Sequence, residues 1–96
     1  MMVVVTYDVN TETSAGRRRL RLVAKICMRY GQRVQNSVFE CSVTPSDYLT
    51  LKHDLAAIVD EKYDSLRYYN LGSRYSSKIE QYGRCRHVPV DGVMML

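Results

Sequence analysis

Apolar residues fall into short blocks along the chain, and the first block is typical of a buried β-strand. Residues 2–8 (MVVVTYD) are mostly apolar and β-branched, and polar turn residues follow them. The block ends on a carboxylate, that of Asp8. Because burying an unpaired carboxylate costs several kcal/mol, we expect Asp8 either to cap a turn or to belong to a functional site.

The second block has the period of an amphipathic helix. Residues 15–30 predict this helix, with Ser14 as its N-cap and Gly31 at its C-terminal end. One face is apolar and is expected to pack on a sheet; it consists of Leu20, Val23, Ala24 and Cys27. The opposite face carries the cations Arg18, Arg21, Lys25 and Arg29, called here the basic stripe.

Three further blocks complete the pattern. Residues 33–43 (RVQNSVFECSV) predict two short strands with a break at the central Asn-Ser pair. The motif TPSD at residues 44–47 is typical of a helix N-terminus with a capping box, and this helix is expected to end near Glu61. Residues 65–72 (SLRYYNLG) predict a fourth strand.

The resulting order, β-α-β-β-α-β, predicts an α+β fold of the ferredoxin-like type, with two helices on one face of an antiparallel sheet. We expect this domain to span residues 1–72 and residues 73–96 to form a C-terminal tail. The tail contains two apolar segments, HVPV at 87–90 and VMML at 93–96. They are expected to add an extra strand to an exposed sheet edge, and in a homodimer the partner would supply that edge.

The charge of the chain is unevenly distributed. The formal net charge is +4, and half of the 14 basic residues lie between Glu12 and Glu40, where no acidic residue occurs. Such a segment favours a surface that binds polyanions such as nucleic acid. The alternative is a merely solvated helix face, but solvated faces normally mix signs for i,i+4 pairing. Because the segment follows the loop after Asp8, we expect the two to lie close together.

Composition also bounds the protein class. No apolar run approaches the roughly 18 residues of a membrane span, and the apolar start is too short for a signal peptide. The 3 cysteines show no CxxC spacing, which argues against a disulfide framework or a zinc knuckle. We therefore expect a cytoplasmic protein in which Cys27 and Cys41 are small buried hydrophobes.

Asp8 is the candidate for chemistry. One carboxylate alone is a weak magnesium site, because Mg²⁺ takes six oxygen ligands and usually keeps several waters. Two-fold symmetry would bring Asp8 of two subunits face to face, where the carboxylates repel each other unless a proton or a divalent cation lies between them. Such a cation would support reactions of phosphodiesters. The alternative for Asp8 is an Asx turn or a loop cap.

Several of these segments resemble one known family. VTYDV, RRRLRLVAKICMRYG, RVQNSVFEC and LRYYNLG, in this order, are similar to the CRISPR-associated protein two family, the minor partner of the CRISPR-associated integrase in spacer acquisition. The resemblance covers residues 2–71. It implies a ferredoxin-like homodimer whose last strand crosses to the partner's sheet. It also implies an endonuclease that depends on Mg²⁺ or Mn²⁺ and cleaves double-stranded DNA or single-stranded RNA.

The resemblance further implies roles for individual residues. The family's acid corresponds to Asp8, as the catalytic and metal-binding residue. Its helix arginines correspond to Arg17, Arg18, Arg19 and Arg21, and its strand motif to Ser37 and Phe39. These six residues, together with Lys25 and Arg29 of the basic stripe, form the predicted nucleic-acid-binding set. By its helical angle, Arg19 points to the flank of the stripe.

Two functions stay open, with a third in reserve. In the first, the protein is a metal-dependent endonuclease of CRISPR adaptation, with Asp8 from each subunit holding one metal ion. In the second, it is a non-catalytic dimer that binds duplex DNA and bridges integrase subunits, so Asp8→Asn leaves DNA binding intact. The third is a ferredoxin-like regulatory module that binds a small metabolite. The acid-free basic segment counts against it, because such a module would not need this segment.

Overall fold

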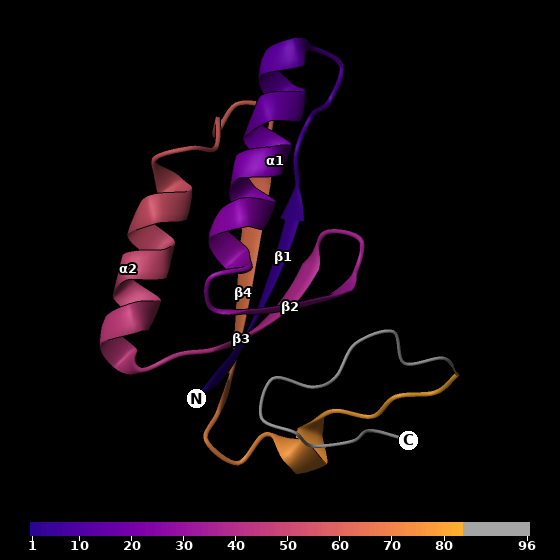
Figure 1. Cartoon of the computed structure of the whole chain (residues 1–96), viewed down its shortest axis with the longest axis vertical. Coiled ribbons are helices and arrows are strands. Elements are labelled where there is room, and N and C mark those ends of the chain that lie inside the picture. Colours follow the sequence, from indigo (N-terminus) through magenta and orange to yellow (C-terminus); the bar gives the residue numbers. More distant parts are fainter. Residues whose placement is uncertain (84–96) are drawn as a thin grey trace.

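The computed structural model describes residues 1–83, which form four strands and two α-helices (Figure 1). A short 3₁₀ helix, η1 (Ser76–Lys78), follows them. None of the helices in this part of the chain is long and apolar enough to cross a membrane. The main elements, in chain order, are β1 (Met2–Asp8), α1 (Ser14–Cys27), β2 (Gly31–Gln35), β3 (Val38–Ser42), α2 (Pro45–Ala56) and β4 (Ser65–Gly72).

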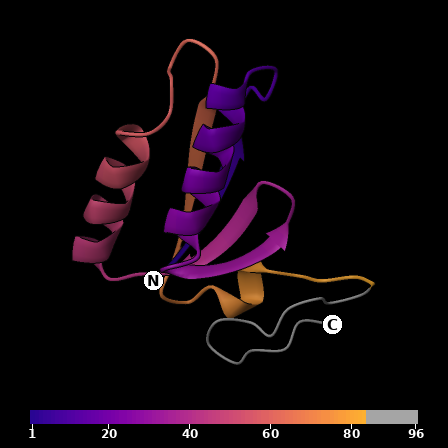
Figure 2. The ribbon, with the colours of Figure 1, turned by 45° about the horizontal axis from the view of Figure 1, so that its top comes forward.

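The strands form one antiparallel sheet in the order β2-β3-β1-β4. Strand β1 therefore lies between β3 and β4, while β2 and β4 form the two edges. Both helices cover the same face of the sheet (Figures 1 and 2). This arrangement confirms the predicted α+β, ferredoxin-like fold. The predicted tail segments at 87–90 and 93–96 lie outside the described residues, and the boundary at residue 72 stays a prediction.

The core lies between the helices and the sheet. Side chains alternate along β1, so that Val3, Val5 and Tyr7 are buried beneath the helices, while Val4 and Asp8 point to the other face. The remaining core residues come from α1, β3, α2 and the loops; they are Val9, Val23, Ala24, Ile26, Cys27, Phe39, Cys41, Val43, Leu51 and Leu55. Cys27 and Cys41 are free and buried, as predicted.

Three predicted helix boundaries are wrong, each for a local reason. The N-cap of α1 is Thr13, whose side chain accepts the Gly16 N–H, and not Ser14. Gly31 does not end α1 but begins β2, where an added Cβ would lie 1.9 Å from the Glu40 carbonyl oxygen. Gly31 is thus needed because β2 and β3 approach each other closely at this residue, and not as a helix cap.

Helix α2 also ends earlier than the sequence predicts. The helix stops at Ala56, and the following turn leads to residues 60–64. There the N–H of Asp60 donates to the Asp64 carboxylate at 2.9 Å instead of continuing a helix. The N-terminus of α2 is as predicted, with a complete capping box between Thr44 and Asp47.

Candidate active site and nucleic-acid interface

Asp8 ends β1 on the sheet face that the helices leave open. Its side chain is exposed, so the strand ends on a charge without burying it. Within residues 1–83, no hydrogen bond or ion pair engages its carboxylate. The Asx turn of the following loop is made by Asn10, whose Oδ1 accepts the Glu12 N–H at 2.9 Å. The alternative role of Asp8 as a turn cap is therefore wrong.

The donor set for a metal ion is incomplete in one chain. Among residues 1–83, no group of three or more His, Cys, Asp or Glu side chains could hold a metal ion. Asp8 supplies a single carboxylate. Mg²⁺ is usually bound by one or two carboxylates and keeps several waters, so an exposed carboxylate such as that of Asp8 suits the ion, and the pair expected in a homodimer would supply two.

Next to Asp8, but on the helix-covered face, three side chains contact one another. The rings of Tyr7 and Phe39 have centroids 6.2 Å apart, and the Arg33 guanidinium carbon lies 5.3 Å from the centre of the Phe39 ring. Burial raises the pKa of the Tyr7 phenol, and the nearby Arg33 partly offsets this effect. Because Phe39 is 0% exposed, the predicted contact between Phe39 and nucleic acid is not compatible with the structure. Phe39 instead supports Arg33.

Ser37 lies where the sequence places it, in the turn between β2 and β3. Its backbone has φ 63°, a left-handed conformation that shapes this tight turn. Its carbonyl accepts the Tyr7 N–H at 3.1 Å, so the turn is attached to the end of β1, one residue before Asp8. The structure thus brings Ser37 near Asp8 through the backbone.

The basic stripe is exposed along its whole length, as predicted for Arg18, Arg21, Lys25 and Arg29. Helix α1 carries no acidic residue, and within residues 1–83 none of the four cations has an ion pair. The stripe faces away from the sheet, whereas Asp8 projects from the opposite face of the sheet, which the helices leave open. The stripe and Asp8 are therefore not as close together as the sequence predicts. Among the predicted contacts on α1, Arg17 reaches the loop that follows Asp8; its Nη1 donates to the Thr11 carbonyl at 3.1 Å.

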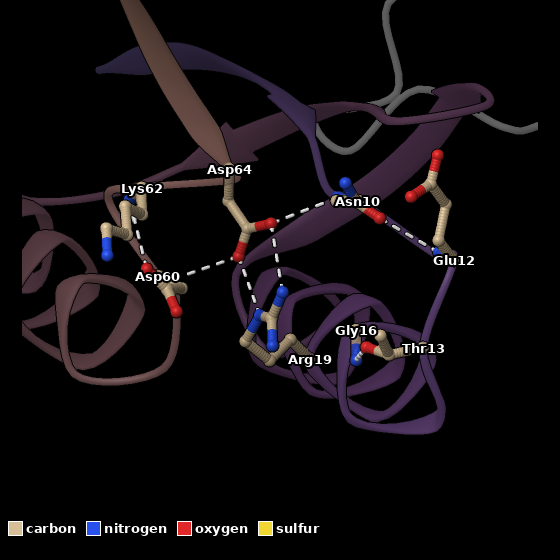
Figure 3. Close-up of polar contacts among 8 residues, drawn as sticks. All are labelled: Asn10, Glu12, Thr13, Gly16, Arg19, Asp60, Lys62 and Asp64. Atoms are coloured by element: carbon tan, nitrogen blue, oxygen red, sulfur yellow. Dashed lines mark hydrogen bonds and ion pairs between the residues drawn. The ribbon is translucent and has the colours of Figure 1, made fainter.

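Arg19 does not belong to the stripe. Its Nε donates to Asp64 Oδ2 at 2.7 Å and its Nη2 to Oδ1 at 3.3 Å, and the Asp64 side chain is 0% exposed (Figure 3). The hydrogen bond from Arg19 is the main reason why the pKa of Asp64 is lowered to about 2. Because two of its donors are used in this pair, Arg19 is poorly placed to bind phosphate, which agrees with its helical angle.

Sequence reasoning missed two residues that shape this region. Arg33 is one of the cations between Glu12 and Glu40, and nothing in the sequence assigns it to the site; its position opposite Phe39 follows only from the hairpin pairing. Asp64 was one of several acids after residue 47, and no local pattern distinguishes it from its neighbours. Only its distance in space to Arg19, 45 positions away in the chain, reveals its part.

Comparison with known proteins gives one consistent result. The family model described as CRISPR associated protein Cas2 matches residues 1–79. The chain is 52% identical over 96 residues to the "CRISPR-associated endoribonuclease Cas2" of Chlorobaculum tepidum, and the match covers 100% of both chains. It is 53% identical over 83 residues to the "CRISPR-associated endonuclease Cas2" of Halalkalibacterium halodurans, covering 86% of each.

The fold is also similar to solved structures. A crystal structure of Streptococcus pyogenes Cas2 matches with a TM-score of 0.77 and 64% sequence identity, covering 86% of this chain and 100% of the other. A crystal structure of a hypothetical protein from Thermus thermophilus matches with a TM-score of 0.73 and 27% identity, covering 90% and 94%. On sequence and fold alike, the chain belongs to the Cas2 family of CRISPR-associated proteins.

Proposed function

We propose that this protein is an endonuclease of CRISPR adaptation that acts as a homodimer with a divalent metal ion, Mg²⁺ or Mn²⁺, held by Asp8. The observation that carries the proposal is the exposed Asp8 carboxylate at the end of the central strand β1, without a partner among residues 1–83. The names of the relatives, endoribonuclease and endonuclease, support phosphodiester hydrolysis.

The open face of the sheet supports the homodimer. On it, Val4 and Thr6 are half-buried, and Tyr69 and Arg67 lie opposite them on β4 and are exposed. Tyr69 is 46% exposed, and its large ring suits an interface. Because Asp8 projects from the same face, packing two copies through it brings two Asp8 carboxylates together, as a shared cation requires. We expect the tail to add a strand to the partner's sheet.

The chain's own residues would bind and orient the substrate around this carboxylate pair. When bound, the metal ion would stabilise negative charge on the phosphodiester and activate water. Arg17 contacts the loop that follows Asp8 and would hold a phosphate of the scissile strand, as arginine does with charge-assisted hydrogen bonds. Arg33, which contacts Phe39, is a further exposed cation on the neighbouring hairpin; it lies on the helix-covered face and would contact nucleic acid that passes around the edge of the sheet. Ser37 would border the site through its turn.

A second function, that of a DNA-holding scaffold that bridges integrase subunits, has its own supporting observation. The basic stripe and Asp8 are on opposite sides of the fold, with the sheet between them. Nucleic acid bound along the stripe would therefore contact phosphate-binding cations without reaching Asp8. Such contacts read no sequence and need no metal ion. The two functions are compatible, because they use different surfaces.

The test compares Asp8→Asn with the wild type and with Asp54→Asn, which removes a carboxylate on α2 that has no assigned role. Each protein is incubated with duplex DNA and with single-stranded RNA, in Mg²⁺, in Mn²⁺ and in excess chelator, and binding is measured on the same substrates. We expect Asp8→Asn to lower cleavage by about 100-fold or more and to leave binding unchanged. Cleavage that survives Asp8→Asn contradicts the endonuclease proposal and leaves the scaffold function.

A further inference from the structure

Asp64 is the single buried charged residue among residues 1–83, and it connects three segments (Figure 3). Its Oδ1 accepts the backbone N–H of Asn10, in the loop after β1, at 3.0 Å. Its Oδ2 accepts the N–H of Asp60, in the turn after α2, at 2.9 Å. Arg19 of α1 donates to both oxygens. A buried carboxylate with this set of donors is fully satisfied and has one geometry.

The position of Asp64 relates it to Asp8. In the sheet register, Asp8 is paired with Ser65, the residue that follows Asp64. Beyond this pair, the ladder between β1 and β4 has ended, and the Asp64 side chain takes its place by accepting the N–H of Asn10. Asp8 therefore lies between two fixed points, the last backbone pair of the sheet and the anchored Asn10.

The other side of Asn10 is equally constrained. A Cβ built on Gly16 of α1 would lie 1.9 Å from the Asn10 carbonyl oxygen, so the loop packs directly against the first turn of the helix. Asn10 is thus held between the α1 backbone and Asp64. Since Arg19 joins α1 to Asp64, the same ion pair sets the distance between the helix and the strand end that carries Asp8.

We propose that Asp64 and Arg19 are positioning residues for Asp8: together they fix the backbone just after it, and with it the direction in which the carboxylate meets a divalent ion. Neither residue touches the ion or the substrate. This inference rests on the proposed function, in which Asp8 holds the metal ion. Groups that orient metal ligands typically affect metal affinity by about 10- to 100-fold, and since Asp64 acts through the backbone we expect the lower end.

The experiment measures Mn²⁺ binding to the full chain by the electron paramagnetic resonance signal of the free ion. It also measures hydrogen exchange of the backbone N–H of Asn10. The variants are Asp64→Asn and Arg19→Lys. Their matched controls are Asp54→Asn and Arg74→Lys, which change the same side-chain types at exposed or half-exposed positions. Thermal unfolding shows which variants are folded at the temperature of the assay.

In Asp64→Asn, we expect Mn²⁺ affinity to fall by about tenfold and Asn10 exchange to quicken by about tenfold or more. Arg19→Lys keeps the charge but loses the second hydrogen bond, so it is expected to show a smaller shift in the same direction. The two controls are expected to behave like the wild type. If Asp64→Asn does not fold, Arg19→Lys decides the outcome by itself.

The inference is overturned if Asp64→Asn or Arg19→Lys is folded and keeps the Mn²⁺ affinity of the wild type, whether or not the exchange of Asn10 becomes faster. In this outcome Asp8→Asn still abolishes Mn²⁺ binding. An equal loss in Asp54→Asn also overturns it, because the effect would then be one of net charge. If Asp8→Asn itself leaves Mn²⁺ binding unchanged, the proposed function fails first and the inference fails with it. The two failures are thus distinguishable.

Discussion

If the basic stripe binds nucleic acid, the affinity must depend on salt in proportion to the number of its cations. The perturbation is the double variant Arg18→Ala and Lys25→Ala, which removes two of the four exposed cations of the stripe without touching the core. Neither residue has an ion pair within residues 1–83 that the substitution would break. The fold should therefore be unaffected, and only the phosphate contacts should change.

The magnitude follows from counterion release. For duplex DNA, the logarithm of the binding constant falls with the logarithm of the salt concentration with a slope of about −0.9 per phosphate neutralised. Four stripe cations per engaged protomer give a slope of about −3.6, so the affinity falls by about 150-fold between about 50 and 200 mM salt. With two cations left, the slope is about −1.8 and the affinity falls by about 12-fold over the same range.

The assay is fluorescence anisotropy of a labelled duplex, titrated at several salt concentrations. The matched control is Lys62→Ala with Arg74→Ala, which also removes one lysine and one arginine, both exposed and both outside α1. We expect the control to keep the slope of the wild type. If the stripe variant and the control show the same slope, the stripe does not hold the phosphates, and the assignment of this surface to nucleic acid is refuted.

The remaining predictions concern the contacts that hold the site in place. The pKa of Asp64 is lowered to about 2 from 3.8, so its stabilising effect is complete above pH of about 3.8 and is lost as the pH falls through about 2. Solvent beside the partly exposed Arg19 screens the pair, so we expect Asp64→Asn to lower the free energy of unfolding in urea at neutral pH by about 1–2 kcal/mol. This difference from the wild type should disappear in acid. A difference that is independent of pH would contradict the ion pair. Gly31→Ala should destabilise the fold by more than about 2 kcal/mol in the same assay, because its Cβ would meet the Glu40 carbonyl; a neutral effect would show that the hairpin can move apart. Thr44→Ala should cost about 1 kcal/mol through loss of the capping box, and an unchanged unfolding midpoint would contradict it.

Much of the fold can be predicted from the sequence, because each element carries its own local signal. The β-branched run of β1, the capping box of α2 and the aromatic strand β4 all lie where they were expected. The errors occur at boundaries, where local signals compete. Gly31 has the residue type of a helix cap, but α1 already ends at Cys27, and the glycine is instead required by the close approach of β2 to the Glu40 carbonyl.

The candidate site was predictable only in part, because its parts differ in range. The basic stripe depends on one helix, and all four of its cations are exposed as expected. The family resemblance assigns Phe39 to the nucleic-acid interface, but strand alternation places it in the core. The Arg19–Asp64 pair spans 45 positions and has no signature in either segment, so only the three-dimensional structure reveals it.

The central claim is that one metal ion is shared by the Asp8 carboxylates of two subunits. It is tested most directly with a mixed dimer, purified through two different affinity tags, in which one subunit is wild type and the other carries Asp8→Asn. If both carboxylates are needed, the mixed dimer is as inactive as the Asp8→Asn homodimer. If it cleaves at about half the rate of the wild type, each Asp8 acts alone and the shared site is contradicted.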